Sequence, residues 1–171
     1  MIREVHVPGA EDFGDVESLL ALAASPGIRP GLERVGRLLE LLGNPQNDYP
    51  ALHVVGTNGK GSTCAFLESV LRAAGYQTAF YSSPHLESPG ERLLIAGRPL
   101  AADRWMAAVQ KTVDAVRGDS SLEADPPSYF EMVTAAAFCL ASEERADVAV
   151  VEAGLGGRVD ATNLLGDVAR S

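Results

Sequence analysis

Residues 56–62, Gly-Thr-Asn-Gly-Lys-Gly-Ser, combine the residue types that hold a phosphate group. They follow a short apolar run at 51–55, typical of a buried strand, and precede a helical pattern at about 62–74. Glycines let backbone N–H groups approach phosphate oxygens, and a helix start adds partial positive charge. Lys60 can reach the β- and γ-phosphates of a nucleotide. The segment therefore predicts a phosphate-binding loop.

The spelling of this loop departs from the general pattern G-x-x-x-x-G-K-[ST]. That pattern needs glycine at position 54 and a hydroxyl residue directly after the lysine, where Val54 and Gly61 stand. Ser62 or Thr63 can still contact a magnesium ion. The alternative is a glycine-rich turn with an incidental lysine. The strand before the loop and the helix after it favour phosphate binding.

Two further residues with metal-binding chemistry stand at or just beyond strand ends. Ser83 follows the predicted strand 77–81, and Glu152 closes the predicted strand 147–152. A hydroxyl and a carboxylate, together with phosphate oxygens, suit magnesium. As alternatives, Ser83 is a turn residue before Pro84, and Glu152 is a solvated charge at a strand end. Carboxyl ends of parallel strands share one edge of a sheet, so we expect these residues to meet the loop there.

The positioning elements alternate between strands and helices, which predicts an α/β fold with a parallel sheet and helices on both faces. Helical patterns cover about 15–24, 31–42, 102–116 and 128–142, and the last is apolar on most sides, as buried helices are. Residues 92–95 and 98–100 predict a hairpin, and 118–127 predict a polar connector.

Composition excludes some classes of function. The formal net charge of −9 argues against nucleic acid as the main partner. No apolar stretch reaches membrane-spanning length, and the first residues lack the pattern of a secretory signal. Cys64 and Cys139 are expected to be free, buried thiols of a cytoplasmic protein.

Several motifs taken in order resemble the dihydrofolate synthase/folylpolyglutamate synthase family of the Mur ligase superfamily. They are GLERV at 31–35, HVVGTNGKGS at 53–62, LESVLRAAGYQTAFYSSPHL at 67–86, ER at 91–92, SYFEMVTAAAF at 128–138 and VVEAGLGGRVDATN at 150–163. The resemblance covers nearly the whole chain after about residue 27. It implies the P-loop NTPase-like central ATPase domain of a Mur ligase, incomplete in this chain.

The resemblance also implies roles for individual residues. The ATP-binding loop corresponds to Thr57, Asn58, Gly59, Lys60, Gly61 and Ser62, with Lys60 as the catalytic residue. The magnesium ligands correspond to Ser83 and Glu152. The pterin contacts correspond to Ser128, Tyr129, Phe130, Glu131, Val159, Asp160 and Ala161.

For three polar residues near these motifs, a purely structural or solubilising role remains an alternative to a functional one. Asp160 either contacts substrate or caps a local turn. His85 is either an acid–base group or, as is commoner for a loop histidine after proline, structural. Arg92 either steers an anionic ligand or is an exposed, solubilising side chain.

The implied reaction is ADP-forming carbon–nitrogen ligation in folate biosynthesis. ATP phosphorylates a carboxylate of dihydropteroate or folylpolyglutamate, and the amine of L-glutamate then displaces phosphate. Mg²⁺ is the implied cofactor, ATP the co-substrate, and the full-length form an expected monomer. Two alternatives stay open: another Mur-type amide ligase, acting on a cell-wall precursor, and a non-catalytic nucleotide-binding module.

The family's later features are expected to be missing from this chain. A further strand should begin near residue 168, whereas a metal-binding histidine, a carbamylated lysine and the C-terminal glutamate-binding domain should follow beyond residue 171. Residues 1–171 are therefore expected to be the N-terminal part of the ATP-binding domain, and to be inactive alone. Whether one or both folate activities are present is open.

Overall fold

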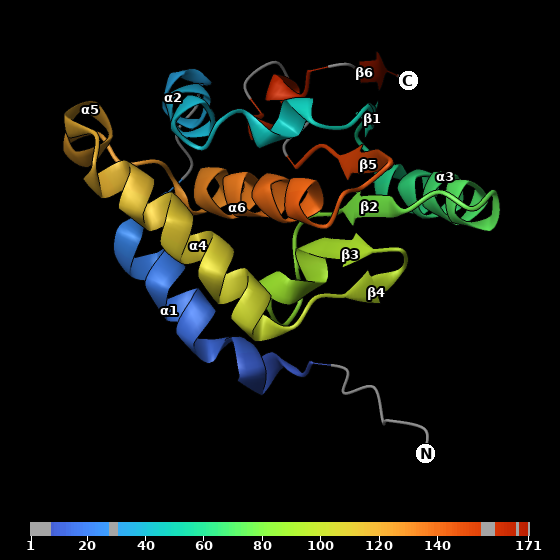
Figure 1. The fold of residues 1–171 in the computed structure, drawn as a ribbon, viewed down its shortest axis with the longest axis horizontal. Coiled ribbons are helices and arrows are strands. Elements are labelled where there is room, and N and C mark those ends of the chain that lie inside the picture. The colour runs from blue at the N-terminus through green and yellow to red at the C-terminus, as the bar shows by residue number, and fades with distance from the viewer. Residues whose placement is uncertain (1–7, 28–30, 155–159, 167, 171) are drawn as a thin grey trace.

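The computed structural model describes residues 8–27, 31–154, 160–166 and 168–170. Their strands form one sheet in the order β4-β3-β2-β5-β1-β6 (Figure 1). The strands are β1 (Ala51–Val54), β2 (Thr78–Tyr81), β3 (Leu93–Ile95), β4 (Arg98–Pro99), β5 (Val148–Glu152) and β6 (Val168–Arg170). Strands β2, β5, β1 and β6 are parallel, and the predicted hairpin β3–β4 adds an antiparallel edge. The further strand expected near residue 168 is β6.

Helices cover both faces of this sheet, as predicted (Figure 1). The α-helices are α1 (Gly14–Ala23), α2 (Glu33–Leu41), α3 (Lys60–Ala73), α4 (Ala102–Arg117), α5 (Ser120–Ala124) and α6 (Tyr129–Glu143). The 3₁₀ turns are η1 (Ala10–Phe13), η2 (Pro45–Asn47), η3 (Pro89–Arg92) and η4 (Ala161–Leu164). Helix α3 covers one face, α6 lies against the other, and α4 packs between α1 and α6.

The alternation of side chains along the strands divides the core in two. Val54 and Val150 pack with Cys64 of α3 on one face. Tyr81 and Val151 belong to the larger core that contains α6 on the other face. Neighbouring strand residues point to opposite faces, so Glu152 shares the α3 side with Val150. This register directs the strand-end carboxylate toward the start of α3.

Helix α6 is central because its sequence is apolar on nearly all sides. Its residues from Glu131 to Ala141 are all buried. A serine directly before an apolar helical run predicts an N-cap, and Ser128 is one: its hydroxyl accepts a hydrogen bond from the backbone N–H of Glu131. Thr134, a buried polar residue of this helix, pairs with the hydroxyl of Tyr81 at 2.7 Å. Helix α6 therefore packs against strand β2 and holds it in place through this hydrogen bond.

Three local predictions differ from the structure. Helix α3 begins at Lys60 rather than at residue 62, because Gly59 adopts the left-handed conformation that starts it (φ 76°). Leu67, Val70 and Leu71 are expected near one apolar side of α3; Leu67 and Leu71 do pack against the core, whereas Val70 is 68% exposed and Glu68 is buried. Glu68 tolerates burial because Thr78 and Arg72 donate hydrogen bonds to its carboxylate. The predicted connector 118–127 contains helix α5.

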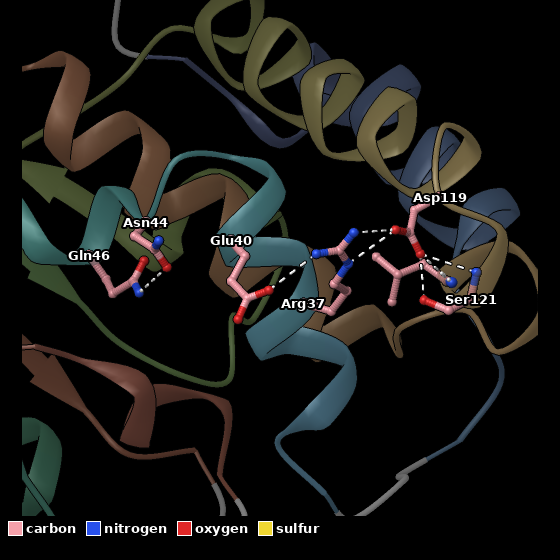
Figure 2. A network of polar contacts seen from close by, with 7 residues as sticks. Arg37, Glu40, Asn44, Gln46, Asp119 and Ser121 are labelled. Carbon is pink, nitrogen blue, oxygen red and sulfur yellow. Dashed lines mark hydrogen bonds and ion pairs between the residues drawn. The ribbon is translucent and has the colours of Figure 1, made fainter.

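A polar network joins α2 to α5 on the surface (Figure 2). Arg37 donates from Nε and Nη2 to one carboxylate oxygen of Asp119, at 3.0 and 2.8 Å, and from Nη1 to Glu40. The other oxygen of Asp119 caps α5 by accepting from the backbone N–H groups of Ser121 and Leu122. These partners hold the pKa of Asp119 well below its usual range, the Ser121 hydroxyl most strongly. We call Arg37, Glu40, Asp119 and Ser121 the α2–α5 network.

The two cysteines are free and buried, as predicted. No helix in the described ranges has both the length and the apolar character that a membrane crossing requires.

Candidate functional site

The predicted phosphate loop connects β1 to α3 at the carboxyl end of the sheet. Residues 56–59 are exposed, and Lys60 is half-buried at the first position of α3. The backbone oxygen of Gly59 accepts hydrogen bonds from both the N–H and the hydroxyl of Thr63, at 3.0 Å each. This first turn is therefore closed, and the exposed N–H groups before it face solvent. The geometry is that of a helix start able to hold an anion.

Glu152 lies against this helix start. A Cβ placed on Gly61 would be 3.5 Å from Oε2 of Glu152, so the carboxylate lies close to the backbone of the first turn of α3. Val54 and Glu152 are paired in register, which fixes the two strand ends together. Burial raises the pKa of the nearby Cys64 thiol to about 12, with the charge of Glu152 adding to the rise and Lys60 opposing it. Lys60 and Glu152 are therefore both close enough to the Cys64 thiol to affect its pKa.

A second group of predicted residues gathers around the ring of Phe130. A Cβ on Gly154 would be 2.5 Å from Cζ of Phe130 and 3.1 Å from Oγ of Ser83. Oγ of Ser83 is buried and has no hydrogen-bond partner among the described residues. The guanidinium carbon of Arg92 lies 5.8 Å from the centroid of the Phe130 ring. We call Ser83, His85, Arg92, Tyr129, Phe130 and Gly154 the Phe130 cluster.

Arg92 is the unexpected member of this cluster. It is only 6% exposed, so the exposed, solubilising role is wrong. Its Nε donates to Nδ1 of His85 at 2.8 Å, whereas its buried Nη1 has no hydrogen-bond partner in the described ranges. Burial, and then the charge of Arg92, lower the pKa of His85. His85 is therefore held as a neutral acceptor and also packs edge-on against Tyr129.

The predicted pterin segment at the start of α6 divides into two pairs. Ser128 and Glu131 form the reciprocal helix cap, in which the Glu131 carboxylate accepts from the Ser128 N–H at 2.7 Å. Arg34 also contacts Glu131, at 3.4 Å. Tyr129 and Phe130 are half-buried and belong to the Phe130 cluster. The structure thus gives the first pair a capping role and brings the second pair to Ser83.

The last predicted segment contains Val159, Asp160 and Ala161. Val159 lies outside the described residues. Asp160 is 3% exposed and caps η4 by accepting from the N–H of Thr162 at 2.9 Å. Ala161 is buried in the main core. Turn capping by Asp160 is therefore present, and it leaves a substrate contact possible as a second role.

Ser83 and Glu152 fit a divalent cation in their chemistry. No group of three or more His, Cys, Asp and Glu side chains able to hold a metal exists in the described ranges. A cation here would therefore need phosphate oxygens or water beside the two protein ligands. The unpartnered Oγ of Ser83 and the Glu152 carboxylate next to the loop are the oxygen donors that such an ion requires. Neither Ser83 nor Glu152 alone would be enough to bind a divalent cation.

These features define an α/β chain with the fold of a Mur ligase, and comparison with known proteins points to one family. No family model matches the chain. It is 40% identical over 140 residues to the dihydrofolate synthase/folylpolyglutamate synthase of Bacillus subtilis, which covers 81% of the chain and 33% of that relative.

Two solved structures agree with this match. The Escherichia coli protein in complex with DHPP and ADP has a TM-score of 0.81 and 39% identity, over 93% of this chain and 37% of that one. A bifunctional folylpolyglutamate synthase/dihydrofolate synthase with Mn, AMPPNP and L-glutamate bound has a TM-score of 0.76 and 37% identity, over 96% and 39%. The predicted resemblance is confirmed: the chain belongs to the dihydrofolate synthase/folylpolyglutamate synthase family and spans about a third of its relatives' length.

Sequence reasoning named Arg92 and His85 separately but missed their pairing, and it missed His53 as a candidate. The buried pairing of Arg92 with His85 joins residues seven positions apart across a turn, and ER alone carries no sign of burial. His53, within β1, pairs with Thr162 at 2.8 Å. The one available signal was a histidine inside an otherwise apolar strand directly before the loop.

Proposed function

We propose that this chain supplies the nucleotide side and the pterin side of an ATP-dependent ligase that joins L-glutamate to dihydropteroate, to folylpolyglutamate, or to both. The observation that carries the proposal is the meeting of three strand ends. The loop after β1, Ser83 after β2, and Glu152 with the following Gly154 at the end of β5 lie at one edge of the sheet. Parallel α/β sheets bind their ligands at this edge.

The proposed mechanism rests on positioning and charge neutralisation. N–H groups of residues 56–59 and the start of α3 receive the phosphates, and Lys60 offsets charge on the transferred phosphoryl group. The substrate carboxylate attacks that group to form an acyl phosphate and ADP. The glutamate amine then forms the amide bond and releases phosphate. No protein nucleophile is required.

Ser83 and Glu152 are proposed to hold a divalent cation, Mg²⁺ in the natural reaction. When bound, that ion supplies further neutralisation of phosphate charge. Tyr129, Phe130 and Asp160 are proposed to contact the pterin. An aromatic ring can stack on a flat heterocycle, and a carboxylate can accept its N–H groups. Ser128, Glu131, Val159 and Ala161 remain proposed members of the same segments.

Other features of the whole protein are also proposals. The domain assignment of residues 1–171 as part of an ATP-binding domain, a cytoplasmic location and a monomeric full-length form stay predictions. Independence from nucleic acid stays a prediction as well, supported by the net charge of −9.

Equilibrium binding to the purified protein tests the nucleotide half of the proposal. Lys60→Ala should weaken binding of a non-hydrolysable ATP analogue with Mg²⁺ by roughly 100-fold, because a charge-assisted contact worth about 3 kcal/mol is lost. Lys111→Ala is the matched control, since Lys111 is an exposed lysine paired with Glu143. Equal affinities for the Lys60 variant and the control would contradict a phosphate loop.

A second titration separates the proposed substrate from the alternatives. Dihydropteroate should bind, and a UDP-linked peptide should not compete with it. Tighter binding of the UDP-linked peptide would favour a cell-wall ligase. Nucleotide binding that no longer needs Mg²⁺ to the same degree in Glu152→Gln would support the metal role of Glu152. An unchanged magnesium requirement would favour the nucleotide-binding module.

A further inference from the structure

A buried chain of polar side chains runs beneath the proposed site, from β1 to η4. His53 is 1% exposed, and its Nε2 lies 2.8 Å from the hydroxyl oxygen of Thr162. That hydroxyl also hydrogen-bonds to Oδ1 of Asp160, which accepts the backbone N–H of Thr162 at 2.9 Å as well. Thr162 is fully buried, and Asp160 is 3% exposed. Such partners satisfy a carboxylate that is nearly removed from water.

The chemistry of the three groups sets the direction of the chain. An ionised carboxylate can only accept, so the single hydroxyl proton of Thr162 points to Asp160. The oxygen of Thr162 must then accept a proton from Nε2 of His53. His53 therefore carries its proton on Nε2, and the chain is ordered from imidazole to hydroxyl to carboxylate.

The ends of this chain belong to the two halves of the proposed site. His53 stands three positions before Gly56, in the strand that leads into the phosphate loop. Asp160 is the cap of η4 in the segment proposed to contact the pterin. Strands β1 and β5 are paired in register, so the histidine stands on a rigid element. A carboxylate on a loop, such as that of Asp160, is positioned more precisely when a residue on a strand supports it than when only its own loop does.

We propose that His53 is a positioning residue for the folate side of the site: through Thr162 it fixes the orientation of the Asp160 carboxylate. The inference rests on the proposed function, in which Asp160 contacts the pterin. His53 does not touch substrate itself. Its effect is to present Asp160 in one orientation, which should appear in dihydropteroate affinity and not in nucleotide affinity.

Matched substitutions at Thr162 test this role. Thr162→Val keeps the shape and removes the hydroxyl, whereas Thr162→Ser keeps the hydroxyl. We expect Thr162→Val to weaken dihydropteroate binding roughly tenfold, as for one lost hydrogen bond to a charged group, and to change ATP-analogue affinity less than about twofold. Thr162→Ser should bind both ligands within about twofold of the wild type.

Substitutions at His53 test the first link of the chain. His53→Gln can present an N–H near the position of Nε2, whereas the shorter side chain of His53→Asn cannot reach it. The asparagine variant should lose dihydropteroate affinity as Thr162→Val does, and glutamine should restore most of it. Combining His53→Asn with Thr162→Val should add no further loss, because both changes break one chain.

A measurement on the wild type keeps the test valid where a variant fails to fold. Proton–nitrogen NMR should show His53 with its proton on Nε2 and a slowly exchanging hydroxyl proton on Thr162. Adding dihydropteroate should shift these signals more than adding the ATP analogue. A proton on Nδ1 alone would overturn the inference.

The binding results distinguish two failures. Equal loss of both ligands in Thr162→Val, no loss of either, or no rescue by Thr162→Ser would overturn the positioning role while leaving the proposed function in place. A wild type that binds the ATP analogue but no dihydropteroate would overturn the folate function itself, and the positioning role with it.

Discussion

Two arginines, Arg37 exposed at the surface and Arg92 buried, have very different polar surroundings. In the α2–α5 network, Arg37 has two carboxylate partners, Glu40 and Asp119 (Figure 2). Arg92 in the Phe130 cluster is more deeply buried, yet its Nη1 has no partner among the described residues. Buried polar atoms in folded proteins normally have partners. The satisfied network thus stabilises the fold, whereas the unpartnered polar atoms of the Phe130 cluster are consistent with its proposed role in ligand binding.

Ser83 extends the same contrast. Its hydroxyl oxygen is buried beside Phe130 and lacks a partner in the described ranges, whereas the hydroxyl of Ser121 bonds to Asp119. Ser83 lies in the loop after β2, whereas Ser121 lies in the first turn of α5. The difference lies in what surrounds each one: the first faces the strand-end edge of the sheet, and the second completes a helix cap.

The largest effect should come from closing the space beside Phe130. Gly154→Ala would put a Cβ 2.5 Å from the Phe130 ring, so the ring must move from its present position. Overpacking of this kind costs about 1–3 kcal/mol. We expect dihydropteroate affinity to fall at least tenfold and Tm to fall by a few degrees, measured by ligand titration and thermal unfolding.

Gly14→Ala is the control for this change, because a Cβ at Gly14 meets no atom within 4 Å. It should leave both ligand affinities unchanged. An unchanged dihydropteroate affinity in Gly154→Ala would show that the Phe130 ring is not part of the ligand site.

The next effect compares the two arginines directly. Arg92→Met removes a buried cation whose Nη1 has no hydrogen-bond partner in the described ranges, but it also removes the Nε–H that donates to His85. Because these two effects on stability oppose each other, we expect Tm to change by no more than a few degrees, while dihydropteroate affinity falls roughly tenfold, as for one lost charged contact. A lower Tm with unchanged affinity would make Arg92 a structural residue instead.

Arg37→Met, in contrast to Arg92→Met, should leave ligand affinity unchanged. Asp119 would lose its charged partner but keep its cap on α5, so the loss is limited to an exposed ion pair. We expect Tm to fall by a few degrees at most, with both ligand affinities unchanged. Weaker dihydropteroate binding in Arg37→Met would remove the distinction between the two regions.

The sequence predicts the elements of both regions better than their contacts. Ser128 before an apolar run correctly places the cap of α6, and the apolar strand ending in Glu152 correctly places β5. Helix α5 is missed because it has only five residues, although Asp119 is a recognisable cap. The face of α3 is predicted only in part because Glu68 is buried through a hydrogen bond from Thr78, ten residues away.

The candidate site divides in the same manner. The local sequence is enough to propose the phosphate loop, Ser83 and Glu152 as site residues, because the pattern that suggests each of them lies within a few residues. The burial of Arg92 and the link between His53 and Thr162 depend on which strands and loops meet. His53 and Thr162 are 109 residues apart, and no short-range pattern contains that distance.

The smallest expected effect is a pH response that separates the two regions. His85 accepts a hydrogen bond from Arg92, and burial lowers its pKa from the ordinary value of 6.5. A lowered pKa means that the unfolded chain takes up a proton at a higher pH than the folded one. Stability is therefore complete above about pH 6.5 and declines as the pH falls below it.

Asp119 also has a lowered pKa, but its stabilising effect is present above the ordinary value of 3.8 and is lost only in stronger acid. Between pH 7.5 and 5.5 the Phe130 cluster should thus respond while the α2–α5 network does not. Thermal unfolding of the wild type should show a small decrease in Tm over this interval, and His85→Gln should reduce that decrease. Asp119→Asn should lower Tm equally at both values of pH, because its carboxylate is ionised throughout the interval. An equal pH response in wild type and His85→Gln would show that the Arg92–His85 pair does not hold the imidazole neutral, and the contrast between the two arginines would then rest on Nη1 alone.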